Sequence, residues 1–307
     1  MNNHWFFIIN PVSGSGNGLK LWERVKVLLD ETAIDYSFGK SEYHRHTIEL
    51  VKAKHQYGVR NFIGIGGDGT LNEIVNAIMI SQNGKDTSKS IISQLSVGTG
   101  NDWVRNQEEQ LSEFNLISKL KANKTILHDV GIVESSKPIL KQYFINVAGT
   151  GLDGRVVHEL EKLSVSGKKS KLAYVQSMLK SLTRFDAPES QVKVGNNQVY
   201  DGKILVVTAS KGQYFGGGMH LSPNAQPNSG TLDITLVKKD SNIVVFPQLY
   251  KLFNGKIAGA TFVEKFTNTM VELTTSFSIP IQADGEFVGE SKHIQFSIVK
   301  HAIKVLV

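Results

Sequence analysis

The 307-residue sequence contains no cysteine, which excludes disulfide bonds and thiolate metal sites. It also lacks any run of about 18 consecutive apolar residues, the length that a membrane-spanning helix requires. The apolar run from Trp5 to Ile9 follows no basic segment and is too short for the core of a secretion signal. These absences predict a cytoplasmic protein without membrane spans.

A strong charge imbalance is missing as well. The 34 Lys and Arg against 28 Asp and Glu leave a formal net charge of +6, and 40% of the residues are hydrophobic, as in ordinary globular proteins. A mild positive charge suits nucleic acid, an anionic membrane surface or a phosphorylated substrate. Because no nucleic-acid-binding motif is present, we expect no nucleic-acid partner. The length suggests two domains.

The most informative segment runs from Asn61 to Met79. Its apolar start, Phe62–Ile65, is typical of a buried parallel strand. After a glycine-rich turn, apolar residues recur with helical spacing at Leu71, Ile74, Val75, Ile78 and Met79. Thr70 and Glu73 have the spacing of a capping box, so the helix is predicted to begin at Thr70.

The turn before this helix contains Gly66, Gly67 and Gly69. Such a turn exposes N–H groups and the positive end of a helix dipole, which together favour an anion. It matches neither of the two common phosphate-binding loop motifs. Asp68 would repel a bare phosphate, but it could act through Mg²⁺ or orient a donor. The alternative is a plain strand-to-helix connection with Asp68 as a cap.

Alternating strand and helix patterns surround this segment. A strand over 6–9 leads through a turn of small polar residues into a helix over 19–29, and an apolar run over 91–97 ends in Gly98–Asp102. Through about residue 128 this alternation predicts a doubly wound parallel sheet. The turns after its strands are expected to converge on one edge.

From Asp129 onward the pattern changes to closely spaced runs of β-favouring residues joined by turn signals. This predicts a second domain built on an antiparallel sheet, with helices near 170–184 and 242–253. The first of these helices is basic and amphipathic, and it could lie on an anionic membrane or pack on its own domain. Edge strands in this domain are compatible with a homodimer.

Asp284-Gly285 lies between alternating apolar residues. This is the strongest short-range signal of a β-hairpin with a type I′ turn. A hairpin tip could also hold Asp284 as a general base.

Four motifs stand out in order along the chain: Asn10-Pro-Val-Ser-Gly14, Gly66-Gly-Asp-Gly-Thr-Leu-Asn-Glu73, Gly98-Thr-Gly-Asn-Asp102 and Asp284-Gly-Glu286. Phosphofructokinases and NAD kinases have close relatives of Gly-Gly-Asp-Gly-Thr, but the combination is more specific. It resembles the soluble bacterial diacylglycerol kinase and sphingosine kinase family of lipid kinases, and the resemblance spans nearly the whole chain.

The resemblance implies two domains with the active site between them. The first, residues 1–128, would be a nucleotide-binding α/β domain of the doubly wound, phosphofructokinase and NAD-kinase-like type, to which residues 295–307 return. The second, residues 129–294, would be a mainly antiparallel β-sandwich domain that supplies the lipid pocket.

The resemblance also implies the functional residues. Asp284 would be the catalytic base, supported by Glu286, and Asp68, Asp102 and Asp129 would form an acidic network for Mg²⁺. The residues expected around ATP are Asn10, Pro11, Val12, Ser13, Gly14, Ser41, Gly66, Gly67, Asp68, Gly69, Thr70, Leu71, Asn72, Glu73 and Thr99.

Bacterial members of the family often hold a structural Mg²⁺ in the second domain, through backbone carbonyls and an aspartate. The corresponding candidates here are Gln226, Ser229 and Thr231. Ser229 replaces the aspartate, and a neutral oxygen is a poorer ligand for a hard cation.

The resemblance therefore implies an ATP- and Mg²⁺-dependent lipid kinase that serves phospholipid biosynthesis at the inner membrane surface. Its acceptor would be a lipid alcohol such as diacylglycerol, converted to phosphatidic acid. A kinase of a soluble acceptor such as NAD, and a lipid- or nucleotide-binding protein without turnover, are the alternatives.

Overall fold

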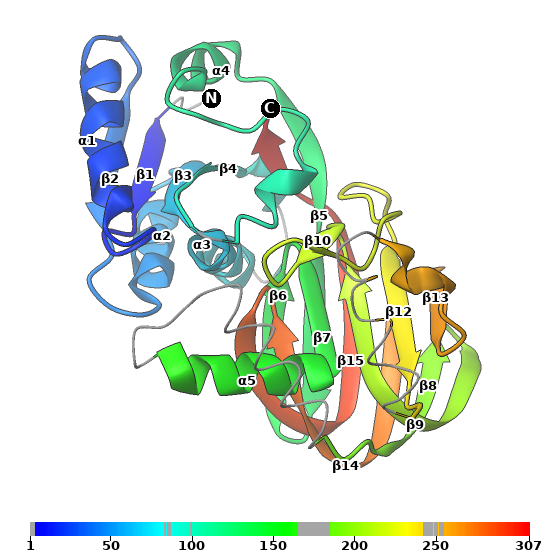
Figure 1. Ribbon diagram of the computed structural model, residues 1–307. Helices are drawn as coiled ribbons and strands as arrows, with labels where there is room; N and C mark the ends of the chain where they lie inside the picture. The colour runs from blue at the N-terminus through cyan, green and yellow to red at the C-terminus, as the bar shows by residue number, and fades with distance from the viewer. Residues whose placement is uncertain are drawn as a thin grey trace. The chain divides into compact units, whose positions relative to one another are not determined.

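The computed structural model describes residues 4–82, 84, 87–98, 100–164, 185–241, 248, 251 and 255–307 (Figure 1). The chain divides into two compact units, the first comprising Met1–Val130 with Lys300–Val307 and the second Gly131–Val299. The predicted helix near 170–184 lies outside the described residues, as does the one near 242–253 apart from Gln248 and Lys251. The division into functional domains after 128 and 294 stays a prediction.

The first unit is a parallel sheet with helices connecting its strands (Figure 1). Its strands run in the order β4-β3-β1-β2, and they are β1 (Trp5–Ile9), β2 (Tyr36–Lys40), β3 (Asn61–Gly66) and β4 (Ile91–Ser96). Its helices are α1 (Asn17–Asp30), α2 (His46–Gln56), α3 (Asp68–Ser81) and α4 (Leu116–Ala122), with the short 3-10 helices η1 (Thr87–Lys89) and η2 (Val104–Asn106). Because β2 and β3 flank β1, the winding reverses there, and the predicted doubly wound α/β fold is confirmed.

The central strand β1 of the first unit is apolar at every residue because it lies in the core. All five residues of β1 are buried, as expected for a parallel strand covered on both faces. Phe7 and Trp22 of α1 lie with ring centroids 5.5 Å apart in the same cluster. Leu306 joins this cluster from the end of β15 (Glu286–Leu306), where Lys304 and Val305 pair in parallel with β4.

The second unit is a mostly antiparallel β structure. Its further strands are β5 (Thr125–Ser136, which begins in the first unit), β6 (Ile139–Phe144), β7 (Val147–Gly151), β8 (Glu189–Val194), β9 (Asn197–Ser210), β10 (Tyr214–Phe215), β11 (Met219–His220), β12 (Leu232–Lys238), β13 (Val263–Asn268) and β14 (Met270–Ala283). In the described residues of this unit, helix α5 (Leu152–Ser164) and the 3-10 helix η4 (Lys256–Gly259) accompany them. The predicted β-rich second domain is confirmed.

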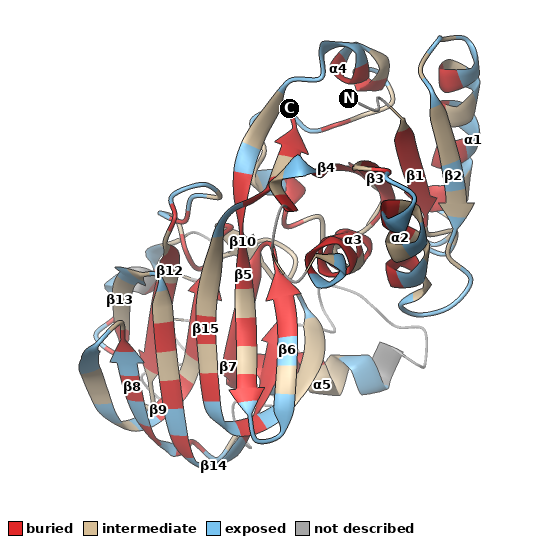
Figure 2. Ribbon diagram, turned by 180° about the vertical axis from the view of Figure 1, so that it is seen from behind, coloured by how far each residue is buried: buried red, intermediate tan, exposed pale blue. Residues whose placement is uncertain are grey.

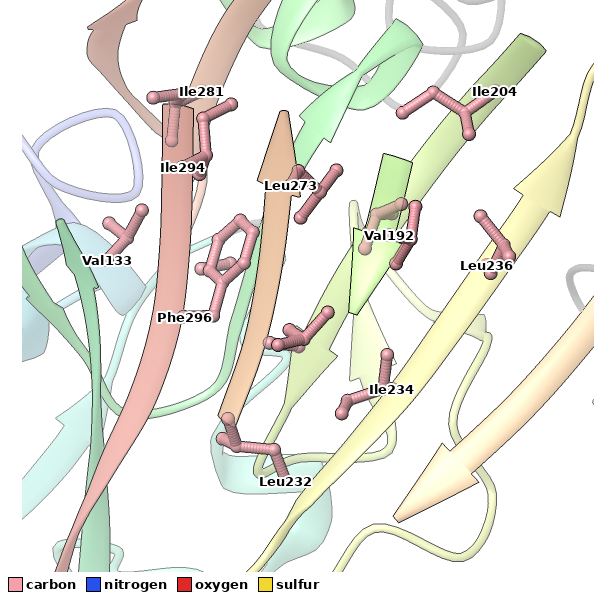
Figure 3. Close-up of a cluster of buried hydrophobic side chains, with 14 of the residues drawn as sticks. Val133, Val192, Ile204, Leu232, Ile234, Leu236, Leu273, Ile281, Ile294 and Phe296 are labelled. Carbon is pink, nitrogen blue, oxygen red and sulfur yellow. The ribbon is translucent and has the colours of Figure 1, made fainter. Parts of the chain in front are cut away.

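Alternation of apolar and polar residues builds this second core. Along β8 exposed and buried positions alternate at every residue, so one face of the strand packs inward (Figure 2). The buried side chains of several strands form one cluster, in which Phe296, Leu273, Val192 and Ile234 come from β15, β14, β8 and β12 (Figure 3).

Two details differ from the sequence-based expectation. Helix α3 begins at Asp68 with Gly67 as its N-cap, so the predicted capping box at Thr70 is wrong. Glu73 instead accepts the N–H of Arg45 at 3.1 Å through its Oε1. Helix α5 was not predicted, although Leu152, Val156 and Leu160 have helical spacing.

In the part of the chain that the structure describes, no helix combines the length and the hydropathy that crossing a bilayer requires.

Candidate active site

The loops that follow β1 and β3 mark the candidate site of the first unit. Strand β1 lies between β2 and β3, and the chain changes its direction of winding there. In open α/β sheets, ligands bind beyond the carboxyl ends of the strands at such a reversal. The residues at this position are the predicted ATP-binding turns that begin at Asn10 and Gly66.

Glycines allow the three turns to approach one another closely. A Cβ atom on Gly14 would lie 2.0 Å from the carbonyl oxygen of Val97, and one on Gly98 would lie 3.0 Å from the Cα atom of Gly67. A Cβ on Gly67 would in turn lie 4.0 Å from Ser13 Oγ. The expected convergence of the turns on one edge of the sheet is therefore confirmed. Thr99, in the third turn, lies outside the described residues.

Asn10 connects the first two of these turns. Its backbone N–H donates to Ile65 O at 2.9 Å, its Oδ1 accepts the N–H of Val12 at 3.3 Å, and its Nδ2 donates to Thr70 Oγ1 at 3.4 Å. Ser41 follows the neighbouring strand β2 and donates its N–H to Ile9 O at 2.9 Å. The structure thus brings these predicted residues to the same edge of the sheet.

Other predicted ATP-binding residues are placed less favourably. The side chains of Leu71 and Asn72 have no exposed surface, because both point into the packing around α3. Val12 is 78% exposed. Pro11 lies in the first turn and Gly69 in the first turn of α3, and both are partly exposed. The contacts of all these residues with a nucleotide stay a prediction.

Asp68 and Asp102 lie together beside Gly100. Asp68 accepts the N–H of Asp102 at 3.1 Å through Oδ2 and that of Trp103 at 3.2 Å through Oδ1. A Cβ atom on Gly100 would lie 3.1 Å from Asp68 Oδ2 and 3.8 Å from Asp102 Oδ2. The two carboxylates therefore border the same point beside the Cα atom of Gly100.

Burial raises the pKa of Asp68 above its ordinary value, although the N–H groups of Asp102 and Trp103 and the charge of Arg105 act in the opposite direction. When burial destabilises the ionised form of a carboxyl group, a nearby cation stabilises that form. Raised pKa values of this kind are common at functional sites.

The third member of the predicted acidic network, Asp129, is fully buried on β5. Its Oδ1 accepts the N–H of His301 at 2.8 Å, which connects it to the last strand of the first unit. Among the described residues, no group of three or more His, Cys, Asp or Glu side chains is arranged to hold a metal ion. Asp68 and Asp102 are thus the two carboxylates that the structure brings together.

Asp284 occupies the predicted hairpin turn of the second unit. The turn residues Asp284 and Gly285 both have positive φ, at 50° and 81°, and Ala283 pairs with Glu286 across them. Positive φ at both central residues is the requirement of a type I′ turn, so the hairpin prediction is confirmed. Glu286 follows directly as the first residue of β15.

Three backbone amides converge on the Asp284 carboxylate. Ile145 donates to Oδ2 at 2.8 Å, and Asn146 and Val147 donate to Oδ1 at 2.9 and 3.0 Å. The N–H of Asp284 returns a hydrogen bond to Val147 O at 2.9 Å. Three N–H donors favour the ionised carboxylate, and they fix its position.

Gln282 and Asp153 support this turn and were not singled out in the sequence. Gln282 Oε1 accepts the N–H of Gly285 at 2.9 Å, and its Nε2 donates to Asp153 Oδ2 at 2.6 Å. Burial raises the pKa of Asp153 to about 6, and the hydrogen bond from Gln282 opposes this shift only partly. Gly149 makes room for Asp153, since a Cβ there would lie 2.2 Å from Asp153 Oδ2.

Helix α5 packs closely against the hairpin. A Cβ on Gly154 would lie 2.3 Å from Pro280 O, so only glycine permits this approach. The ring of His158 stacks on that of Phe287 with centroids 4.1 Å apart, and Glu161 Oε1 accepts the N–H of Phe287 at 2.8 Å. The helix therefore holds the strand that follows the turn.

The predicted structural metal ligands lie in the turn after β11. Ser229 Oγ is 3.2 Å from Gln226 O and 3.1 Å from Thr231 O. The Nζ atom of Lys211 donates to Ser229 Oγ at 3.1 Å and to Thr231 O at 2.7 Å. The Lys211 side chain thus forms hydrogen bonds with two of the residues that we predicted from the sequence as metal ligands.

Comparison with protein families covers both units. Residues 4–133 match the diacylglycerol kinase catalytic domain family, and residues 146–307 match the family described as YegS C-terminal NAD kinase beta sandwich-like domain. A protein of Bacillus subtilis (strain 168) named "Putative lipid kinase YtlR" is 27% identical over 301 residues, which cover 94% of each chain.

Two solved structures show the same fold. One is described as a putative diacylglycerol kinase from Bacillus anthracis str. Sterne; it has a TM-score of 0.76 at 18% identity and covers 99% of this chain and 96% of its own. The other, an NAD kinase from Archaeoglobus fulgidus in complex with ATP, has a TM-score of 0.53 at 10% identity and covers 99% of this chain and 93% of its own.

Proposed function

Because this chain belongs to the diacylglycerol-kinase-type family of lipid kinases, we propose that it transfers the γ-phosphate of ATP to the hydroxyl of a lipid alcohol. The proposed acceptor is diacylglycerol and the product phosphatidic acid. The observation that carries this proposal is the Asp284 carboxylate, held by three backbone amides at the tip of a rigid hairpin.

Asp284 is proposed to orient the acceptor hydroxyl and take its proton. A kinase base must be ionised and within hydrogen-bond reach of that hydroxyl. The three N–H donors favour the ionised form, and the type I′ turn and Gln282 hold the carboxylate in place. Phosphoryl transfer passes through a loose transition state, so positioning matters more than a high basicity. Glu286, next to the turn, is proposed to support Asp284.

The glycine-rich turns of the first unit are proposed to bind the ATP phosphates. They lie at the winding reversal of the sheet, and α3 begins directly after Gly67. The N-terminus of a 14-residue helix offers N–H groups and a positive dipole to a phosphate. Asn10, Ser13, Gly14 and Ser41 are proposed to complete the nucleotide site.

Asp68 and Asp102 fit the role of Mg²⁺ ligands, since they border the same point beside Gly100. Mg²⁺ in kinase sites is commonly held by one or two carboxylates together with phosphates and waters. When bound there, the ion would neutralise charge on the phosphates. Asp129 is proposed to act on this pair from a distance, through ordered water.

The proposal is tested by transfer of label from γ-labelled ATP into a panel of lipid alcohols in mixed micelles. Label in diacylglycerol that is lost in Asp284→Ala, while nucleotide binding persists, would support both the reaction and the acceptor. Asp201→Ala is a matched control, because Asp201 is an exposed aspartate on β9. Diacylglycerol vesicles with and without anionic lipid would test action at a membrane surface.

Two other results would change the assignment. Label in NAD and in no lipid would make the protein a kinase of a soluble acceptor. Binding of nucleotide or lipid without any transfer of label would make it a binding protein.

A further inference from the structure

The turn from Gln226 to Thr231 gathers oxygen atoms at one point of the second unit. Ser229 Oγ lies 3.2 Å from Gln226 O, 3.1 Å from Thr231 O and 3.2 Å from Thr231 Oγ1. Carbonyl and hydroxyl oxygens are the atoms that hard cations prefer. The cluster is therefore a candidate cation site, although Gln226 and Ser229 themselves lie in an exposed turn.

Lys211 supplies a positive charge to this cluster. The residue follows directly after β9, and its side chain has no exposed surface. Its Nζ donates to Thr231 O at 2.7 Å and to Ser229 Oγ at 3.1 Å. An ammonium group carries three donors and no acceptor, so it bonds naturally to converging oxygens.

The same oxygens do not fit a divalent cation while Lys211 is in place. Mg²⁺ binds oxygen at about 2.0–2.1 Å, so an ion on Thr231 O would lie within about 5 Å of Nζ. Like charges at that distance repel strongly in a protein interior. In addition, Ser229 offers a neutral hydroxyl where a carboxylate would be needed to balance the charge.

We propose that the ammonium group of Lys211 is the structural cation of the second unit, and that it replaces a divalent metal ion at the Gln226–Thr231 cluster. The lysine attaches the turn to the end of β9 without any metal. The second unit is then stable without a divalent ion at this cluster.

The attachment lies close to the proposed base. The N–H groups of Lys211 and Gly212 both donate to Asn146 O, at 2.7 and 3.1 Å. Asn146 in turn donates its own N–H to Asp284 Oδ1 at 2.9 Å. Loss of the ammonium is therefore expected to disturb the amides around Asp284. This consequence rests on the proposed function, whereas the test below is independent of activity.

The first test compares melting temperatures of the full chain, without nucleotide, in EDTA and in excess Mg²⁺ or Ca²⁺. The wild-type melting temperature should be the same in all three solutions. Lys211→Met should lower it by several degrees, and neither ion should restore it. Lys193→Met, at an exposed position on β8, is the control and should change nothing. A wild-type melting temperature that falls in EDTA and recovers with Mg²⁺ would refute the proposal, as would an unchanged Lys211→Met.

A second pair of variants keeps the test valid if Lys211→Met fails to fold. Ser229→Asp alone should remain insensitive to divalent ions, because the new carboxylate pairs with the ammonium. Combining Ser229→Asp with Lys211→Ala should create a metal site, seen as a melting temperature that rises with Ca²⁺ and as one additional Mn²⁺ bound per chain by electron paramagnetic resonance. Metal sensitivity in Ser229→Asp, or none in the double variant, would overturn the assignment.

Discussion

The glycine-rich turn of the first unit and the hairpin turn of the second both present an aspartate, but they hold it differently. Asp68 accepts the N–H groups of Asp102 and Trp103 at 3.1 and 3.2 Å, with Asn101 of the same loop as a weaker backbone donor, and burial nevertheless raises its pKa. Asp284 accepts three N–H groups at 2.8–3.0 Å from the connection between β6 and β7. The balance between burial and backbone donors thus differs between the two sites.

This difference corresponds to different chemical tasks. Burial destabilises the ionised form of a carboxyl group, so the binding of a cation stabilises this form strongly. This property suits a residue that binds Mg²⁺. A carboxylate that receives three backbone N–H groups is ionised and fixed in position before the reaction, which suits a base that orients a hydroxyl and then takes its proton. Asp153 is a further buried carboxyl group, and burial raises its pKa to about 6.

The largest expected effect comes from removing the charge of Asp284. We expect Asp284→Asn to lower turnover about 10²- to 10⁴-fold, the usual contribution of a positioned base. The amide cannot take up a proton, and its NH₂ group would face a backbone N–H. Turnover is measured with γ-labelled ATP and diacylglycerol, alongside Asp201→Asn. Activity equal to wild type would remove Asp284 from the role of base.

The next effect concerns the pH dependence of stability at Asp153. Its folded-state pKa, about 6, lies above the ordinary value of 3.8. At a pH between 3.8 and about 6, Asp153 is ionised in the unfolded chain but still protonated in the folded protein. Raising the pH through this range therefore lowers the free energy of unfolding, by about 3 kcal/mol in total. The free energy of unfolding of Asp153→Asn should not show this decrease with pH. Urea unfolding of both proteins at pH 4.5 and pH 7 is the measurement, and an equal change in both would contradict the prediction.

A smaller effect is expected at Asp68, where we predict about 10- to 100-fold weaker use of Mg-ATP in Asp68→Asn, because the variant loses one of the two carboxylates proposed to hold Mg²⁺. Because the pKa of Asp68 is raised, protons compete with Mg²⁺, so the kcat/KM of the wild type should fall as the pH is lowered toward that pKa. The kcat/KM of Asp68→Asn should not show this fall at low pH. Steady-state kinetics across pH at varied Mg-ATP would show it; identical profiles would exclude Asp68 from the metal site.

The smallest expected effect is the loss of stability on replacing glycines in the turn after β1. Comparing Gly14 with Gly16 distinguishes the cost of backbone strain from the cost of a steric clash. Gly14 and Gly16 both have positive φ, at 58° and 91°, but only a Cβ on Gly14 would meet another atom, Val97 O at 2.0 Å. Gly16→Ala should cost about 1–2 kcal/mol of stability. Gly14→Ala should cost more and also weaken ATP binding, because the turns must separate. Equal results in unfolding and in nucleotide titration would argue against the convergence of the turns.

Some features followed from short stretches of sequence. The apolar faces of α1 and α3 and the buried strand β3 were predicted from periodicity, because each pattern depends only on neighbours along the chain. The turn at Asp284-Gly285 was predicted for the same reason, since glycine adopts positive φ freely and aspartate tolerates it better than most residues. The motifs in the glycine-rich turns also identified the sheet edge at which they converge.

Other features depended on partners far away in the chain. The start of α3 was predicted two residues late, because Glu73 pairs with Arg45 rather than closing a capping box. The three amides around Asp284 come from residues nearly 140 positions earlier. No local pattern contains such pairings, since they follow from how strands align in the folded sheet.

The sequence alone thus determined the alternation of elements, the two kinds of sheet and the residue types at the turns, all of which are local properties of the chain. Only the tertiary structure decided the state of the charged groups. It buried Asp153, placed two carboxylates beside Gly100 and brought Lys211 to the oxygens around Ser229. The physical reason is that burial and hydrogen-bond partners, which set the charge of a side chain, exist only after distant segments have packed together.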